Sequence, residues 1–368
     1  MRNTILGQVV NVLDKFGYAD GWRVDEHVRL VADTTGDGNK DIVGFGGNGL
    51  FVSTSNGDNS FNAPSLVLDA FGYNDGWRVD EHIRYMADLR KTGRADVVGF
   101  GADGVSVSLN NGGGEFGSPF VASSSFGVSE GWNMSIHLRF LADATGDGFL
   151  DIVGFADSFI YVSKGNGDGT FGTPTQVLER FCLRDGWTIT DDVRTLADMT
   201  GTGNVDVVGF GGPGVFISYN NGNGTFQDPQ QVIAQFGYNA GGWRVEKHPR
   251  YVADVTGDGR GDLVGFADDG VYVSYNNGDG TFSAPAVLVV SGFGYAAGNW
   301  RVEKHPRFVV DLTGDGRADI IGFGDDGVYV AYNDGTGNFG PIQQLDTAFS
   351  YNGGWTENQT VRWVANLF

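Results

Sequence analysis

Seven tryptophans recur at intervals of 55 to 57 residues, and scarce polar side chains follow them at fixed positions. The tryptophans are Trp22, Trp77, Trp132, Trp187, Trp243, Trp300 and Trp355. All five histidines stand five positions after one of them, and they are His27, His82, His137, His248 and His305. An indole with an imidazole at constant spacing can bind a small polar ligand. The segment around each tryptophan is called a Trp loop below, numbered one to seven in chain order.

An arginine stands seven positions after every one of these tryptophans. These arginines are Arg29, Arg84, Arg139, Arg194, Arg250, Arg307 and Arg362. Every copy of a repeat needs its architectural residues, whereas ligand binding can be lost from some copies. We therefore interpret this arginine as structural and expect it to bond the neighbouring repeat.

A second arginine, directly after the tryptophan, occurs together with a carboxylate two positions later or not at all. The pairs are Arg23 with Asp25, Arg78 with Asp80, Arg244 with Glu246 and Arg301 with Glu303. Loops three, four and seven lack both members. The joint loss indicates that the two side chains act together, either as an ion pair or as a charged clamp on a ligand. In an extended segment they would share one face with the histidine.

This set of side chains suits a neutral sugar, because an aromatic ring covers the apolar C–H face while charged groups bond adjacent hydroxyls. We predict sugar contacts in loops one, two, five and six, and weak or altered binding in the others. The predicted residues are Tyr18, Trp22, Arg23, Asp25, His27, Tyr73, Trp77, Arg78, Asp80, His82, Tyr238, Trp243, Arg244, Glu246, His248, Tyr295, Trp300, Arg301, Glu303 and His305. The alternatives are a tryptophan wedge between blades, a structural histidine, and a surface ion pair worth about 0–1 kcal/mol.

The repeat also predicts the fold. Its copies restart at Phe16, Phe71, Phe126, Phe181, Phe236, Phe293 and Phe349. In the fifth copy, short apolar runs bounded by glycine predict strands at 250–254, 263–266, 271–275 and 286–290, with a hairpin turn at NNGDGTF. Four-stranded units at this period are typical of a β-propeller. We predict one all-β propeller domain over residues 1–368.

The number of blades follows from the innermost strands. Seven segments match this strand, beginning at Val28, Ile83, Leu138, Val193, Pro249, Pro306 and Val361, but only six full sets of middle strands exist. We expect a seven-bladed propeller whose seventh blade combines residues 361–366 with the N-terminal segment 5–13, so that the paired ends close the ring. Six blades with a closing seam are the alternative.

An Asp/Gly loop follows the first strand of each repeat. Its sequence in the first copy, DTTGDGNKD, resembles the calcium loops of FG-GAP repeats in integrin propellers. The third loop position is never acidic, and the second copy holds Arg90 and Lys91. A turn held by Asx and Thr hydrogen bonds is therefore the alternative. We predict no required cofactor, and the candidates for calcium are Asp33, Asp37, Asp41, Asp254, Asp258 and Asp262.

Charge and composition exclude several classes of protein. The net charge of −21 disfavours nucleic acid and anionic membranes as ligands. No apolar run has the length of a membrane span, and the first 16 residues lack a signal-peptide core. We expect cytoplasmic synthesis, with action outside the cell after non-classical release. The single cysteine, Cys182, excludes an intrachain disulfide and is either a buried thiol or an intermolecular bridge.

The repeat as a whole resembles a known family. The pattern FGYxDGWRVxxHxR followed by VADxTGDGxxDIVGF is similar to that of the Photorhabdus-type seven-bladed β-propeller lectins. It is more distantly similar to the Psathyrella velutina lectin, another propeller of FG-GAP-like repeats. The resemblance covers essentially the whole chain. It implies sugar sites between neighbouring blades, a preference for fucose and related or O-methylated sugars, and a homo-oligomer that agglutinates or attaches to host cells through their glycans.

Two other functions compete with sugar binding. Adjacent carboxylates such as Asp25 and Glu26 would face opposite ways on a strand and could not flank one glycosidic bond. No nucleophile elbow, zinc-ligand cluster or phosphate-binding loop occurs, so we predict that the protein is not an enzyme. A protein-binding propeller of FG-GAP or integrin-like type, without sugar specificity, remains the alternative. The repetition of one polar set disfavours it, because a protein partner rarely has the same symmetry.

Overall fold

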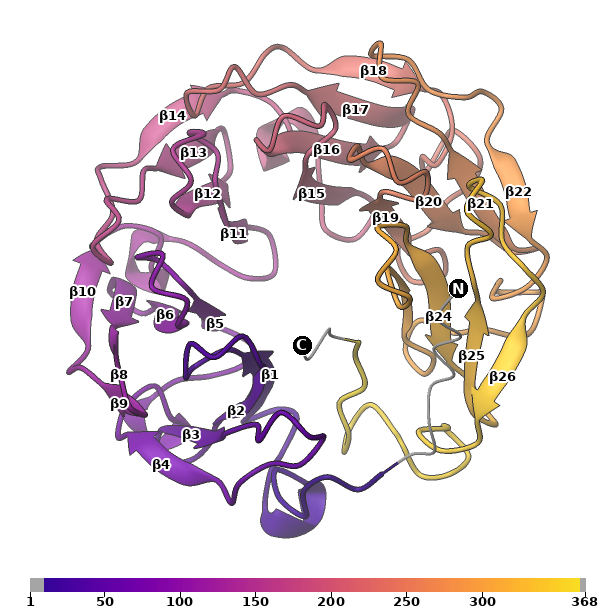
Figure 1. Cartoon of the computed structure of the whole chain (residues 1–368). Coiled ribbons are helices and arrows are strands. Elements are labelled where there is room, and N and C mark those ends of the chain that lie inside the picture. The colour runs from indigo at the N-terminus through magenta and orange to yellow at the C-terminus, as the bar shows by residue number, and fades with distance from the viewer. Residues whose placement is uncertain (1–9, 365–368) are drawn as a thin grey trace. The chain divides into compact units, whose positions relative to one another are not determined.

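The computed structural model describes residues 10–364 of the 368-residue chain. Over these residues the chain forms 26 β-strands and four short 3₁₀ helices (Figure 1). The predicted all-β class is therefore confirmed. Within the same residues, no helix is long and apolar enough to cross a membrane.

The strands form six four-stranded antiparallel sheets, which are the predicted blades of the propeller. The chain divides into two compact units, and each is described by itself. Blades one to three belong to the unit that contains Val10–Val177, and their last strand ends at the boundary residue Leu178. Blades four to six belong to the unit that contains Leu178–Glu357.

Blade one consists of β1 (Val28–Ala32), β2 (Asp41–Phe45), β3 (Leu50–Ser53) and β4 (Ser65–Leu68). Blade two consists of β5 (Ile83–Ala87), β6 (Asp96–Gly101), β7 (Gly104–Ser108) and β10 (Phe120–Ser123). Blade three consists of β11 (Leu138–Ala142), β12 (Asp151–Phe155), β13 (Ile160–Ser163) and β14 (Thr175–Leu178). A separate hairpin joins β8 (Asn110–Gly112) and β9 (Glu115–Phe116). The 3₁₀ helices lie in Trp loops one to four, at Tyr18–Asp20, Tyr73–Asp75, Val128–Glu130 and Leu183–Asp185.

Blade four consists of β15 (Val193–Ala197), β16 (Asp206–Gly211), β17 (Gly214–Ser218) and β18 (Gln230–Ile233). Blade five consists of β19 (Arg250–Ala253), β20 (Asp262–Phe266), β21 (Val271–Ser274) and β22 (Val287–Val290). Blade six consists of β23 (Arg307–Val310), β24 (Asp319–Phe323), β25 (Val328–Ala331) and β26 (Gln343–Asp346). The four strands predicted for the fifth copy are confirmed to within one residue at each end.

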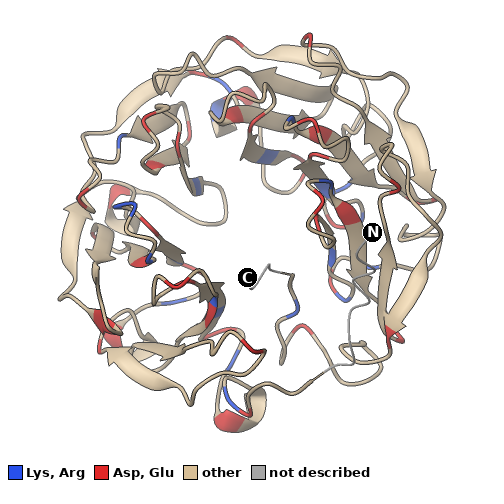
Figure 2. Ribbon diagram, viewed as in Figure 1, with Lys and Arg blue, Asp and Glu red and all other residues tan. Residues whose placement is uncertain are grey.

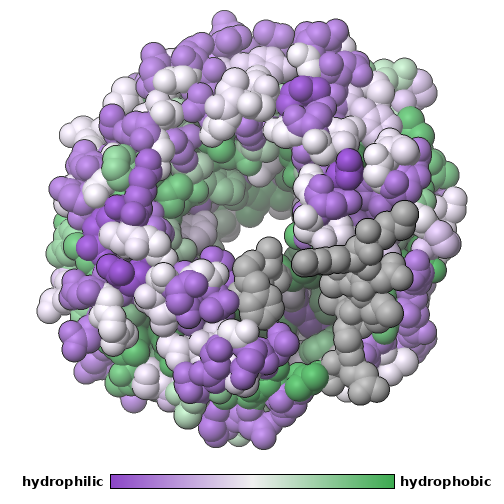
Figure 3. Space-filling model, in the orientation of Figure 1, coloured by the Kyte–Doolittle hydropathy of each residue, from purple (hydrophilic) through white to green (hydrophobic). Residues whose placement is uncertain are grey.

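The core is built from the two middle strands of each blade. All five residues of β20 are buried, and Val264 and Phe266 pack in one apolar cluster with Ile320 of the next blade. Outer strands such as β18 and β22 carry no charged residue, and Figure 2 shows the acidic residues gathered in loops and at strand ends. The face turned to the viewer in Figure 3 is mostly hydrophilic. Burial of the middle strands, rather than helix packing, therefore stabilises each blade.

The seventh blade is not formed by the described residues. Residues 361–364, the start of its predicted first strand, carry no strand, and neither do residues 10–13 at the N-terminal side. A strand needs a hydrogen-bonded neighbour, and the seventh copy supplies no middle strands to pair with. Residues 5–9 and 365–366, the rest of the two predicted strands, lie outside the described residues.

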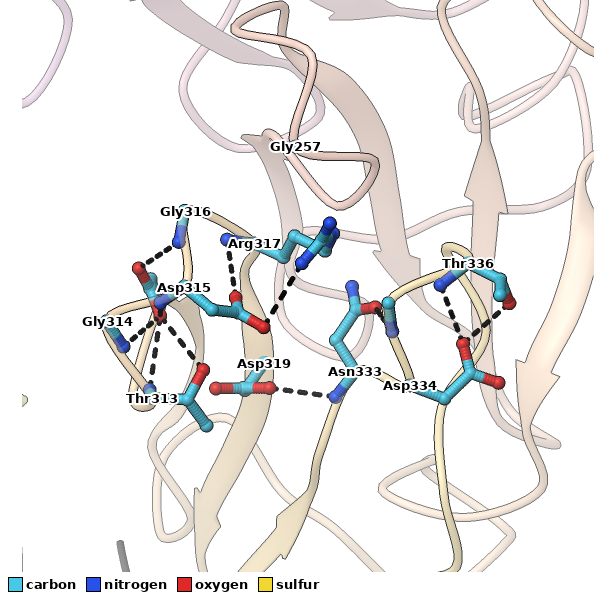
Figure 4. Close-up of polar contacts among 12 residues, drawn as sticks. Gly257, Thr313, Gly314, Asp315, Gly316, Arg317, Asp319, Asn333, Asp334 and Thr336 are labelled. Carbon is cyan, nitrogen blue, oxygen red and sulfur yellow. Dashed lines mark hydrogen bonds and ion pairs between the residues drawn. The ribbon is translucent and has the colours of Figure 1, made fainter. Parts of the chain in front are cut away.

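The Asp/Gly loop is a turn held by its own aspartates. In the sixth copy, Asp311 accepts N–H bonds from Gly314 and Gly316 at 2.7 and 2.8 Å. At the end of the loop, buried Asp319 accepts the N–H group of Leu312 at 2.9 Å and that of Asn333 at 2.8 Å, and Figure 4 shows the bond from Asn333. The interpretation of this loop as a turn with Asx and Thr hydrogen bonds is confirmed.

Cys182, the single cysteine, is completely buried at the start of a 3₁₀ helix in the fourth Trp loop. Its Sγ lies 3.5 Å from a carboxylate oxygen of Asp185, and burial raises the pKa of the thiol. Of the two interpretations, the structure favours the buried thiol.

Each tryptophan of loops one to six lies on a glycine in the second strand of its own blade. A Cβ placed on Gly265 would stand 2.5 Å from Cη2 of Trp243. The equivalent glycines, with Cβ positions 2.3 to 2.6 Å from the indole, are Gly44, Gly99, Gly154, Gly209 and Gly322. Carbon atoms in contact are normally about 3.5–4 Å apart. The glycine of the repeated DIVGF-type strand is therefore required by the close approach of the indole.

Replacing this glycine tests the packing. For Gly322→Ala we expect a loss of about 1–3 kcal/mol of unfolding free energy, because the new methyl group overlaps Trp300. Urea unfolding followed by tryptophan fluorescence measures it. The control is Gly340→Ala, where a Cβ would meet its nearest atom at 3.7 Å. Equal stability of the two variants would contradict the packing account.

Candidate functional site

The Trp loop is a closed turn. In loop six, the His305 N–H donates to the Arg301 carbonyl at 2.7 Å, and the Arg301 N–H donates to Nδ1 of His305 at 3.1 Å. The other four histidine-containing loops form the same two bonds. The expectation of an extended segment is wrong, because these reciprocal bonds curl positions +1 to +5 into one turn. The side chains at +1, +3 and +5 therefore do not alternate along a strand.

The arginine at +7 anchors the start of the loop. Its Nη1 donates to the carbonyl of the first phenylalanine of the repeat in all seven copies, at 2.7 to 3.3 Å. That phenylalanine has φ between 55° and 68°, an uncommon conformation for a residue with a Cβ. Nη2 of Arg250 reaches the Asp191 carbonyl of the preceding loop at 3.5 Å, and Nη2 of Arg362 reaches Lys304 at 2.6 Å. The predicted structural role is confirmed by these bonds.

The arginine at +1 lies against the tyrosine of its own loop. The guanidinium carbon of Arg301 is 3.7 Å from the centre of the Tyr295 ring, and Nη1 donates to the Tyr295 and Trp300 carbonyls at 2.7 and 3.0 Å. Loops one, two and five repeat this arrangement. The structure thus brings together the predicted arginine and tyrosine, and the arginine bonds the loop backbone.

The carboxylates at +3 stand apart from these arginines. Asp25, Asp80, Glu246 and Glu303 are exposed, and within residues 10–364 no ion pair joins them to the arginine at +1. The ion pair offered as one explanation of the joint loss is therefore absent from this part of the chain.

The tryptophan is mainly a packing residue. Trp243 and Trp300 are only 8% and 7% exposed, and each ring centre lies 5.0 Å from that of the first phenylalanine of its repeat. The histidine ring touches the indole in an edge contact, with ring centres 5.5 Å apart in both loops. In loops five and six the indole therefore positions the histidine and leaves only a small part of its own surface exposed to a ligand.

The second nitrogen of the histidine meets an aspartate that the sequence reasoning missed. Nε2 lies 2.9 Å from Asp157 in blade three, 3.1 Å from Asp268 in blade five and 2.9 Å from Asp325 in blade six. Each aspartate stands 20 residues after its histidine, in the turn between the second and third strands. The shared spacing, together with a tyrosine 24 residues after each histidine, is the signal that could have revealed these residues.

The pair has a defined direction of hydrogen bonding. Because Nδ1 accepts the backbone N–H, the proton of the neutral ring is on Nε2, which donates to the aspartate. Burial lowers the pKa of His248 and His305, and the nearby aspartate raises it by less. The ring is therefore neutral at pH 7, with one donor and one carboxylate side by side.

Pockets open beside this pair in blades five and six. The blade-six pocket, of about 460 Å³, is lined by Trp300, His305, Asp325, Tyr329 and Ile342, among others. The blade-five pocket, of about 550 Å³, is lined by Trp243, His248, Asp268 and Tyr272 in the same places. Both have the size of a small-ligand site, with apolar walls and a few convergent polar groups.

Blade three carries the same four residue types, although its loop lacks the arginine and carboxylate of the predicted set. Trp132 and Tyr161 lie with ring centres 6.5 Å apart, and His137 bonds Asp157. Blades one and two keep tryptophan and histidine but have Gly47 and Ala102 where the aspartate would stand. In blade two, Nε2 of His82 is buried and meets no hydrogen-bond partner among residues 10–364. The complete set of Trp, His, Asp and Tyr, called the quartet below, thus occurs in blades three, five and six.

The candidate calcium ligands of the Asp/Gly loops lie elsewhere in each blade. Asp33 and Asp254 accept two or more backbone N–H groups of their loops, and buried Asp41 and Asp262 do so as well. Asp37 and Asp258 accept the N–H of the residue two positions on. Over residues 10–364, no cluster of three or more metal-ligating side chains is found. These carboxylates accept hydrogen bonds from the backbone of the turn.

Comparisons with known proteins identify relatives of this chain. A family model described as an FG-GAP-like repeat matches residues 198–263. A solved lectin from Agrocybe aegerita, described as specifically recognising non-reducing terminal N-acetylglucosamine, is 52% identical, with a TM-score of 0.95 over 97% of this chain and 90% of that one. The pore of a Photorhabdus luminescens Tc holotoxin shares the fold, at 15% identity and a TM-score of 0.53 over 89% of this chain and 14% of that one. No curated protein sequence matches. The FG-GAP-like repeat is thereby confirmed.

The buried histidines make stability depend on pH. Their folded-state pKa is lowered, so the unfolded chain binds protons more readily, and stability is lost as pH falls from about 6.5 through the folded pKa. The double variant His248→Asn/His305→Asn should lose less stability between pH 7 and pH 5 than the unchanged protein. Buried Asp206 and Asp262, with pKa raised to about 6, act in the opposite direction in both proteins. Thermal unfolding across this range measures the difference, and parallel curves would contradict it.

Proposed function

The chain belongs to the family of FG-GAP-like repeat lectins that includes the Agrocybe aegerita protein, and we propose that it binds glycans ending in N-acetylglucosamine. The proposed sites lie at the quartets of blades three, five and six. Binding leaves the sugar intact, as expected of a lectin rather than an enzyme. The single observation that carries the placement is the His–Asp pair, which is present in all three quartets and lines a pocket in blades five and six.

The pocket chemistry supports an N-acetylated sugar. Nε2–H of His305 can donate to a hydroxyl or carbonyl oxygen, and the carboxylate of Asp325 can accept from a hydroxyl or amide N–H. The edge of Trp300, Tyr329 and the side chain of Ile342 supply apolar surface for the C–H groups of the ring and for the acetyl methyl. An acetamido group presents an acceptor, a donor and a methyl together, which matches this mixed lining.

The resemblance to Photorhabdus-type lectins led to an expectation of fucose or O-methylated sugars. The relative that is 52% identical is instead described as recognising terminal N-acetylglucosamine. Identity at that level over 97% of the chain is the stronger guide to the sugar. We therefore propose N-acetylglucosamine as the ligand and place fucose among the comparison sugars of the test.

Several equal pockets on one chain would act together on a glycan-covered surface. A second binding event on the same surface is intramolecular, and avidity then exceeds single-site affinity by a factor of about 10²–10⁴. We propose that the protein attaches to or agglutinates cells outside its own cell, and that self-association, where it occurs, adds to this effect.

Removal of the aspartates tests the sites. In calorimetry the unchanged protein should bind N-acetylglucosamine at its three quartets and fucose more weakly. Asp268→Asn with Asp325→Asn should leave one site at the original affinity. The other two should weaken by about 1.5–3 kcal/mol, or about 10- to 150-fold, because a charged acceptor is lost.

The control variant is Asp279→Asn, since Asn223 holds the same turn in the fourth copy. It should bind as the unchanged protein does. Unchanged stoichiometry and affinity in the double variant would place the sugar elsewhere.

A further inference from the structure

The pocket of blade four departs from the quartet. It has a volume of about 690 Å³ and is lined by Trp187, Asp192 and Phe216, with Tyr238 from the following Trp loop. The tryptophan is kept, with its indole on Gly209. The histidine, the aspartate of the turn and the tyrosine of the third strand are replaced by Asp192, Gly212 and Phe216. Blade four thus keeps a pocket and its tryptophan but has different polar groups around them.

Asp192 takes over only half of the histidine's role. Its Oδ2 accepts the Thr188 N–H at 2.9 Å, as Nδ1 of histidine accepts in the other loops. The residue is 8% exposed and lines the pocket, and the bond from the Thr188 N–H engages one of its two carboxylate oxygens, Oδ2. The carboxylate can therefore accept a further hydrogen bond from a group in the pocket. The group that faces the ligand has therefore changed from an N–H donor to an anionic acceptor.

The charged groups that line the pocket are mostly negative. The pocket is lined by four carboxylates, on Asp185, Asp191, Asp192 and Asp228, and by one cation, Arg180. The buried arginines Arg194 and Arg250 lower the pKa of Asp192, but burial raises it by more. The blade-five pocket, by comparison, holds two carboxylates and a histidine. The aromatic walls and excess negative charge of blade four suit a cation that carries an apolar ring face.

We propose that the blade-four pocket binds a non-reducing terminal hexosamine whose 2-amino group is free and charged. The ammonium would bond Oδ1 of Asp192, while Trp187 and Phe216 contact the C–H groups of the ring. An N-acetylated sugar is disfavoured there, because the pocket has lost the imidazole donor and offers several acceptors to a neutral amide. This inference rests on the proposed function, since it assumes that the Trp-loop pockets hold sugars, and it adds a second sugar class to the same chain.

The test uses the full chain and two probes, the methyl glycosides of glucosamine and N-acetylglucosamine, in separate titrations at pH 6.5. The amino sugar should bind at one site per chain, and its affinity should fall as salt is raised from about 0.05 to 0.5 M. Asp192→Asn should weaken this binding by about tenfold or more and leave binding of the N-acetylated sugar unchanged. Asparagine keeps an oxygen for the Thr188 N–H, and an unchanged melting temperature verifies the fold.

Asp279→Asn is the matched control, because it removes one carboxylate from an exposed turn outside the pocket. The second variant is Asp192→His with Gly212→Asp, which restores the polar pair of the quartet and should abolish binding of the amino sugar. The inference is overturned if the amino sugar does not bind while the N-acetylated sugar does, or if either Asp192 variant leaves amino-sugar binding intact. Failure of both sugars to bind would instead overturn the proposed function.

Discussion

The contact between each indole and a strand glycine is the constraint on which the rest of the blade depends. The glycine lets the ring lie against the second strand, and the first phenylalanine packs beside the indole against the same glycine. With the indole fixed, the loop that follows must curl, and the curl brings residue +5 back to the backbone at +1. The histidine is thereby held beside the turn between the second and third strands of the same blade. The contacts that pack the indole therefore also position the histidine of the candidate sugar site.

The two ring nitrogens of the histidine have different partners. In loop five, Nδ1 of His248 accepts a backbone N–H of the loop, and Nε2 bonds Asp268 at the pocket. Blade four keeps the first function with the carboxylate of Asp192 and changes the second. Three positions, residue +5, the turn aspartate and the third-strand tyrosine, set the polar character of a pocket, and none of them is the glycine or the phenylalanine against which the indole packs. A repeat protein of this kind can thus vary its ligand from blade to blade at little cost to the fold.

Much of the fold could be predicted from the sequence, because strands, turns and glycines have local signatures. The strands of the fifth copy, the Asp/Gly turn and the arginine at +7 follow from period, turn chemistry and presence in every copy. The shape of the Trp loop could not be predicted from the sequence, because alternating polar residues are compatible with a strand and also with a turn closed by a histidine. Asp325 reaches His305 only because β24 and β25 pair in one particular register, which places the turn between them beside the Trp loop. The residues near the tryptophan do not reveal that register. The sequence therefore favoured blades one, two, five and six, and the geometry favours three, five and six.

A crystal structure of the protein with N-acetylglucosamine tests the central claim most directly. The account predicts sugar density beside His137, His248 and His305, with a sugar oxygen or nitrogen in hydrogen-bond distance of the partner aspartate in each. Blades one and two, which lack that aspartate, should hold less sugar at the same concentration. Density at the Asp/Gly loops, or at blades one and two with the quartet pockets empty, would contradict it.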